Sequence, residues 1–161
     1  MDNMEIKLEK YINQKDSWPQ SGQHILAQYD NSSIIVYQAY NWIIAKFASK
    51  NRYFYNGFSF NRMSWIKPNF LWMMYRSGWG QKKGQTRVLA IRLKREFFDK
   101  VLSLAVYSAY NQLLYKSHDD WKKAVSDSEV RLQWDPDHKP NGEREERRAI
   151  QLGLRGEILK E

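Results

Sequence analysis

Hydrophobic and polar residues alternate over several short stretches of the chain, a pattern typical of β-strands with one buried face. Residues 24–30 and 33–40 have this character and are separated by the turn residues Asp30 and Asn31. We therefore expect these two stretches to form a β-hairpin. Further strands are predicted over residues 88–93, 130–135 and 149–154.

Apolar residues at helical spacing predict three main helices. The first follows the N-cap residue Asn41 and runs to about residue 50, the second covers residues 68–77, and the third covers about 95–114. Residues 116–129 are mostly polar, with one further turn expected around Trp121. Residues 51–61 and 136–148 lack periodicity and are interpreted as loops, the second of them mobile.

These elements predict an α+β fold: a single domain with a small, mostly antiparallel sheet of about five to six strands, packed with two to four helices. We assign residues 23–161 to this domain and residues 1–22 to an N-terminal leader or lid. A chain of 161 residues is large enough to bury a core without disulfides or metals.

The composition excludes several classes of protein. Because the chain has no cysteine, it has no disulfide framework and no thiolate nucleophile. His24, His118 and His138 show no metal-ligand spacing, so no metal is expected. No apolar run reaches the roughly 18 residues of a membrane span, and the N-terminus is charged. We therefore expect a cytoplasmic protein with no membrane partner.

The positive charge is concentrated in the middle of the chain. Residues 62–100 contain ten Lys or Arg and two Asp or Glu, a net of +8 that equals the formal charge of the whole protein. Such a basic region indicates a polyanionic partner. The candidates are nucleic acid, either RNA or single-stranded DNA, and a phosphate-bearing small molecule.

Aromatic rings lie among these cations, which suits a ligand that has both stacked rings and phosphates. The rings are Trp65, Trp72, Tyr75 and Trp79, and the cations include Arg62, Lys67, Arg76, Lys82 and Lys83. Two of these residues also have a purely structural interpretation. Trp72 could belong to the core, and Arg76 could serve only to stabilise the C-terminal end of its helix.

Two of the predicted strands end in polar side chains. Tyr37, Gln38 and Tyr40 lie at the end of the strand 33–40, although such residues often serve as packing or hydrogen-bonding groups. In the strand 130–135, alternate apolar residues are expected to face the core. Gln133 and Asp135 then point the other way, where they could orient a ribose hydroxyl.

Several motifs resemble the domain-of-unknown-function family 4291. They are VYQAY at 36–40, RMSWIKPNFLWMMYRSGW at 62–79, VLAI at 88–91, QWDP at 133–136 and IQLGL at 150–154. The resemblance covers about residues 24–157. Members typically read Arg-Gln-Ile-Arg-Ala where this chain has QHILA at 23–27, so two arginines are missing there.

The order of the elements is also similar to the layout of ADP-ribosyltransferases, which place an H-Y-E or R-S-E trio around NAD. Gln38 stands where these enzymes have His or Arg, and Gln133 stands where they have Glu, so neither trio is complete. The similarity therefore rests on topology.

These resemblances lead to the hypothesis of an NAD-dependent, ADP-ribosyltransferase-like domain that acts on nucleic acid. The expected roles are catalysis by Gln38, Tyr75, Gln133 and Asp135, NAD binding by Tyr37, Tyr40, Arg62, Trp65, Lys67, Trp72 and Arg76, and nucleic-acid contacts by Trp79, Lys82, Lys83 and Arg87. One alternative is a non-catalytic module that stacks RNA or single-stranded DNA bases on its tryptophans. Another is a nucleotide-processing enzyme without a macromolecular target.

Overall fold

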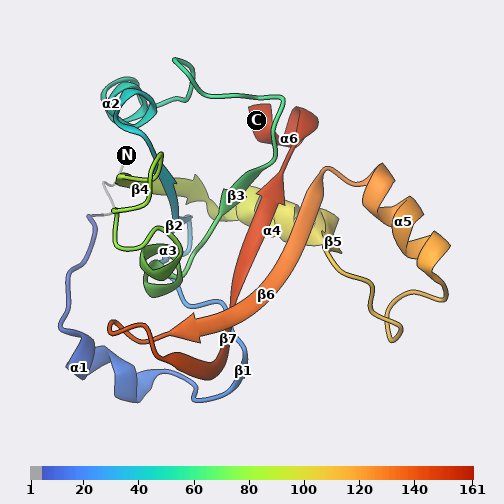
Figure 1. Ribbon diagram of the computed structural model, residues 1–161, viewed down its shortest axis with the longest axis horizontal. Coiled ribbons are helices and arrows are strands. Elements are labelled where there is room, and N and C mark those ends of the chain that lie inside the picture. The colour runs from blue at the N-terminus through green and yellow to red at the C-terminus, as the bar shows by residue number, and fades with distance from the viewer. Residues whose placement is uncertain (1–4) are drawn as a thin grey trace.

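The computed structural model describes residues 5–161, whose strands form two sheets (Figure 1). The strands are β1 (Gly22–Gln23), β2 (Ser33–Tyr40), β3 (Ser64–Ile66), β4 (Arg87–Lys94), β5 (Ala105–Tyr107), β6 (Val130–His138) and β7 (Arg144–Leu154). The larger sheet has the order β1-β7-β6-β5, with β3 also paired to β7, and the smaller sheet pairs β2 with β4. A single bridge between Tyr37 and Lys67 joins β2 to the residue that follows β3.

The helices are α1 (Tyr11–Gln14), α2 (Trp42–Asn51), α3 (Phe70–Arg76), α4 (Arg95–Leu104), α5 (His118–Asp127) and α6 (Gly156–Lys160), with a 3-10 turn at Lys15–Ser17. In Figure 1, α4 crosses behind β6 and β7, while α2 and α6 lie at the top. The β2–β4, β3–β7 and β6–β7 pairs are antiparallel. The predicted α+β class, with a mostly antiparallel sheet, is therefore confirmed.

The hydrophobic core lies between the two sheets and α4. Its fully buried side chains include Val36 of β2, Val101 of α4, and Ile150 and Leu152 of β7. Val130 of β6 belongs to the same cluster, and Leu132 and Trp134 pack against it, which confirms the predicted orientation of that strand. None of the helices in residues 5–161 has both the length and the apolar character needed to cross a bilayer.

Two helices begin at asparagine caps. The Asn41 side-chain oxygen accepts a hydrogen bond from the Ile44 N–H at 3.0 Å, as predicted for the start of α2. The Asn69 oxygen accepts one from the Trp72 N–H at 2.9 Å, so α3 begins at Phe70. These local hydrogen bonds satisfy N–H groups that the helix itself leaves unpaired.

The predicted hairpin of residues 24–30 and 33–40 is wrong. Residues 24–28 form no strand, and only a single bridge connects Tyr29 with Ile34. The partner of β2 along its whole length is β4, which is more than forty residues away in the sequence. Short alternating stretches do not encode which partner they pair with, because pairing is decided by tertiary packing.

The predicted helix 95–114 is correct only in its first half. α4 ends at Leu104, and Ala105–Tyr107 then pair in parallel with β6 as the edge strand β5. The predicted mobile loop at 136–148 is also wrong, because β6 continues to His138 and β7 begins at Arg144. A buried ion pair between Asp137 and Arg147 holds these two strand ends together. The composition of the segment does not show that two of its charged residues pair inside the protein.

Gly153 in β7 is packed closely by the segment that precedes and includes β3. A Cβ atom at this position would lie 2.6 Å from the Met63 Sδ and 3.0 Å from the Trp65 Cε2. We expect Gly153→Ala to destabilise the fold by about 1–3 kcal/mol through overpacking, as measured by urea unfolding. The double variant with Met63→Ala should recover most of this loss, and a failure to recover would show that the Met63 contact is not the cause.

Candidate functional site

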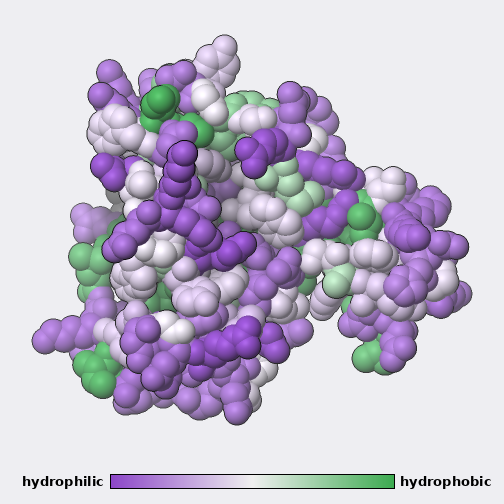
Figure 2. All heavy atoms as spheres, viewed as in Figure 1, coloured by the Kyte–Doolittle hydropathy of each residue, from purple (hydrophilic) through white to green (hydrophobic). Residues whose placement is uncertain are grey.

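The second face of the larger sheet carries polar side chains. Residues of β6 and β7 alternate across the sheet, so the neighbours of the core-facing residues point to the opposite side. We call the side that bears Gln133, Asp135 and Gln151 the polar face. Since α4 lies behind β6 and β7 in Figure 1, the polar face is turned toward the viewer, where Figure 2 shows many hydrophilic residues.

The Asp135 carboxylate is held by two amides on the polar face. One of its oxygens accepts a hydrogen bond from the Gln133 Nε2 at 2.8 Å, and the other accepts one from the Gln151 Nε2 at 2.6 Å. The Gln133 oxygen in turn accepts a bond from the Ser108 hydroxyl at 3.3 Å. This network fixes the orientation of the carboxylate while leaving each oxygen a free lone pair.

Lys67 lies on the polar face at the junction of the two sheets. Its backbone exchanges two hydrogen bonds with Tyr37, at 2.8 and 3.1 Å. The side chain is buried, with 6% of its surface exposed. The pKa of Lys67 is lowered to about 8, mainly by burial and in addition by the positive charge of Arg76, while the negative charge of Asp135 acts in the opposite direction.

Arg76 ends α3 with an exposed guanidinium group. Within residues 5–161, no carboxylate lies within ion-pair distance of either the Arg76 guanidinium or the Lys67 ammonium, and neither group donates a hydrogen bond. Two neighbouring cations without a direct anionic partner are suited to bind an anion. A phosphate group would accept hydrogen bonds from both.

Tyr75, Trp72 and His138 form a stack where α3 meets the end of β6. The ring centroids of Tyr75 and His138 are 3.6 Å apart, and those of Trp72 and His138 are 5.4 Å apart. Trp72 is buried, and its ring is stacked on Tyr75 and His138, so the core interpretation of Trp72 applies. Tyr75 keeps 45% of its surface exposed and has its ring against His138.

Gln38 and Tyr40 lie on the core side of the sheets rather than on the polar face. The Gln38 Nε2 donates to the Ser64 hydroxyl at 2.6 Å and to the Trp65 carbonyl at 3.2 Å, and the Tyr40 hydroxyl lies 3.1 Å from the Ser64 hydroxyl. Burial raises the pKa of Tyr40. The structure therefore brings Gln133, Asp135, Lys67 and Arg76 into one region but places Gln38 elsewhere.

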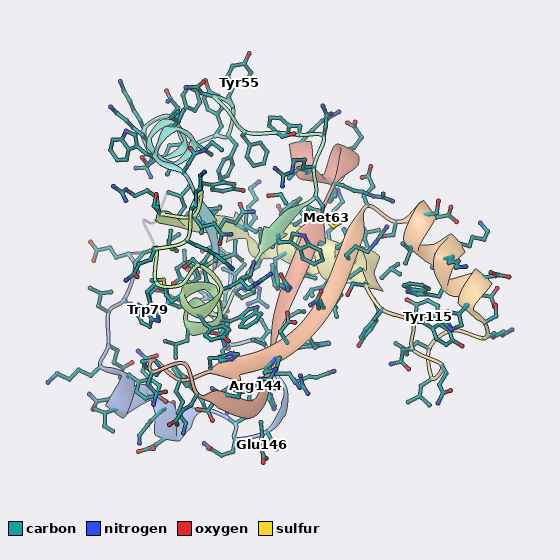
Figure 3. All side chains as sticks on the ribbon, viewed as in Figure 1. Tyr55, Met63, Trp79, Tyr115, Arg144 and Glu146 are labelled. Carbon is teal, nitrogen blue, oxygen red and sulfur yellow. The ribbon has the colours of Figure 1, made fainter. Side chains whose placement is uncertain are left out.

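The loop after α3 carries three of the residues predicted to contact nucleic acid, and the fourth, Arg87, begins β4. Trp79 adopts a left-handed backbone conformation, is 48% exposed, and lies on the outer side of this loop in Figure 3. The Lys82 ammonium donates to the Arg76 carbonyl at 3.3 Å, and Lys83 is exposed. The Arg87 guanidinium lies 5.3 Å from the Trp42 ring.

The remaining predicted residues surround the polar face unevenly. Trp65 is half-buried and packs on Gly153, on the polar side of β3. Tyr37 packs its ring against Phe70, with the centroids 5.3 Å apart. Arg62 is exposed, and no contact places it beside Lys67. No three His, Asp or Glu side chains in the described part of the chain gather as metal ligands.

Sequence reasoning missed Gln151 and Ser108. Gln151 is the one polar residue in the apolar stretch 149–154, and it lies directly opposite Gln133 in the β6–β7 register. That isolated polar residue was a usable signal, because a buried amide needs a hydrogen-bonding partner. Ser108 had no comparable signal, since its position depends on the pairing of β5 with β6.

Comparisons with known proteins give one assignment. No curated protein and no solved structure matches the chain. The model of one protein family matches residues 24–161, which is most of the chain and includes every residue of the polar face described above. The chain belongs to the family described as domain of unknown function DUF4291.

Proposed function

We propose that the polar face binds NAD and supports the transfer of its ADP-ribose to nucleic acid. The observation that carries this proposal is the pair of cations, Lys67 and Arg76, beside the firmly oriented carboxylate of Asp135. The two phosphates of NAD need cationic donors, which Lys67 and Arg76 supply. The ribose hydroxyls need a hydrogen-bond acceptor, which Asp135 supplies.

The aromatic residues next to the cations provide surfaces for the rings of such a ligand. Tyr37 is bridged to Lys67, and Trp65 lies two residues before it on the same side of β3. Both rings are only partly buried, so each retains surface for contact with a base or a nicotinamide ring.

The proposed reaction exchanges one bond for another at the ribose C1′ atom. The bond to the nicotinamide nitrogen breaks, and nicotinamide leaves with the bonding electron pair. An oxygen or nitrogen of the nucleic acid then bonds to C1′ and releases its proton to water. The Asp135 carboxylate would stabilise the positive charge that develops on the ribose, and its two amide partners would keep it in place.

Binding of NAD should raise the melting temperature of the protein. At a concentration one hundred times the dissociation constant, the stabilisation should be about 2.7 kcal/mol. Arg76→Ala should abolish the shift because it removes one of the two phosphate-binding cations. Lys50→Ala is the matched control, since Lys50 is an exposed cation at the end of α2. A shift that persists in Arg76→Ala would exclude the polar face as the NAD site.

A second candidate function is non-catalytic binding of RNA or single-stranded DNA. The exposed loop that presents Trp79, Lys82 and Lys83 favours this function, because it combines a stacking surface with charges open to a flexible strand. Release of nicotinamide in the presence of oligonucleotide separates the two candidates, since only the transferase produces it.

The loop makes a quantitative prediction for either function. If Lys82 and Lys83 each contact a phosphate, the double variant Lys82→Ala/Lys83→Ala should make the slope of log K against log salt shallower by about 1.4 for a single-stranded oligonucleotide. Fluorescence anisotropy at several salt concentrations measures the slope. An unchanged slope would show that these lysines do not contact the strand.

A further inference from the structure

A separate cavity of about 560 Å³ opens on the core side of the molecule, opposite the polar face. It is bounded by the sheet β2–β4, the loop that follows α2, and α6, the elements at the top of Figure 1. Its volume is within the range of small-molecule sites. Lys67, Arg76 and Asp135 do not line it, so it is not part of the proposed nucleotide site.

The walls of this cavity are mainly aromatic and aliphatic. Phe54, Phe58 and Phe60 extend from the loop after α2, with the ring of Phe58 centred 4.8 Å from each of the other two. Leu89 of β4 and Ile158 of α6 line the cavity as well. Phenyl groups that meet at angles present both ring faces and ring edges, which suits a flat aromatic guest.

The polar lining of the cavity includes Gln38 and Ser64, which are 6% and 8% exposed. The Gln38 amide nitrogen is fully used by the Ser64 hydroxyl and the Trp65 carbonyl. These two bonds fix the orientation of the amide, so its carbonyl oxygen does not face the Ser64 hydroxyl or the Trp65 carbonyl. No residue in the range 5–161 donates a hydrogen bond to that oxygen, and the oxygen is not fully buried. Because Gln38 lines the cavity, the oxygen is available to a donor on a ligand there.

We propose that this cavity binds a neutral heteroaromatic compound that carries an N–H donor, such as a free nucleobase or an aromatic carboxamide. The ring would lie among the phenyl groups, and its N–H would donate to the Gln38 carbonyl oxygen. A purely aliphatic ligand would leave that oxygen without a donor, and a charged ring would lose its hydration against the phenyl groups. The charged lining residues, Arg52, Arg92, Lys160 and Glu161, come from other parts of the wall than the three phenyl groups. The site is independent of the proposed NAD reaction, because its residues and its side of the sheet differ.

Adenine and nicotinamide are the probes, and toluene is the control ring without a donor. NMR titration of the full chain should give dissociation constants for the two probes in the range of about 0.1–10 mM. Gln38→Leu should weaken both probes about tenfold or more, because it removes the acceptor, and should leave toluene binding unchanged. Equal effects of Gln38→Leu on all three compounds would overturn the assignment of Gln38.

A second variant keeps the test valid if Gln38→Leu fails to fold. Ser49 lines the cavity from the exposed side of α2, so Ser49→Trp can block the cavity without changing the core. This variant should abolish binding of both probes, whereas Arg76→Ala should leave it intact. Probe binding that survives Ser49→Trp, or no saturable binding to the wild type, would overturn the proposal. Loss of the NAD effect in Arg76→Ala alone would concern only the polar face.

Discussion

Replacing Asp137 with Asn should destabilise the protein by about 3–5 kcal/mol, because it leaves the buried guanidinium of Arg147 without its counter-charge. The two side chains are 1% and 5% exposed, and the Asp137 Oδ2 accepts from the Arg147 Nε at 2.8 Å and Nη2 at 2.7 Å. The same oxygen accepts from the Asn69 Nδ2 at 2.9 Å. One carboxylate therefore connects β6, β7 and the start of α3.

Arg147 extends this connection to the N-terminal segment. Its Nη1 donates to the Pro19 carbonyl at 2.7 Å, and its guanidinium lies 5.4 Å from the centre of the Trp18 ring. Urea unfolding monitored by tryptophan fluorescence measures the loss for Asp137→Asn.

An exposed ion pair in the same hairpin supplies the matched control. Lys139 and Glu143 are 2.9 Å apart but remain accessible to water, so Glu143→Gln should leave the unfolding midpoint nearly unchanged. The double variant Asp137→Leu/Arg147→Met should recover much of the stability lost in Asp137→Asn, since it removes both buried charges. Equal and small effects of Asp137→Asn and Glu143→Gln would contradict the assigned role of the buried pair.

Replacing Lys67 with Met should stabilise the fold near neutral pH by about 1–3 kcal/mol and weaken NAD binding by about tenfold to a hundredfold. The stabilisation is expected because burial lowers the pKa of Lys67 to about 8, so its charged form is less stable in the folded protein than in water. The loss of binding is expected because the ammonium is one of the two proposed phosphate donors.

The effect of pH tests the cause of this stabilisation. Between pH 8 and about 10.5, the folded protein has released the Lys67 proton while the unfolded chain retains it, so the free energy of unfolding of the wild type rises with pH. The advantage of Lys67→Met should therefore shrink across this window. Chemical unfolding at pH 7, 9 and 10.5 measures the trend, with Lys94→Met as the exposed control. An advantage that stays constant with pH would show that the ammonium charge is not its source.

Local patterns in the sequence predicted the elements whose formation depends on their own residues. Asn41 provides a cap beside apolar residues at helical spacing, so the start of α2 could be placed. The apolar spacing alone predicted the helix 68–77, whereas α3 begins at Phe70 because the cap is Asn69. The alternation in residues 130–135 correctly assigned Asp135 and Gln133 to the face opposite the core. These features depend on side-chain periodicity and on hydrogen bonds between residues three positions apart. Both are local, so a short stretch of sequence is enough to predict them.

Contacts between residues far apart in the sequence decided which strands pair and which side chains are buried. The charged stretch after Asp135 becomes a hairpin because Asp137 and Arg147 pair inside the protein, and Trp72 is buried because α3 packs on His138 of β6. Gln38 and Gln133 were grouped because the order of the elements resembles that of ADP-ribosyltransferases. In the structure they lie on opposite sides, because the Gln38 side of β2 faces the core and the Gln133 side of β6 faces away from it. Long-range packing decides which strands pair and which face of each strand is turned toward the core. The order of residues alone does not specify this packing.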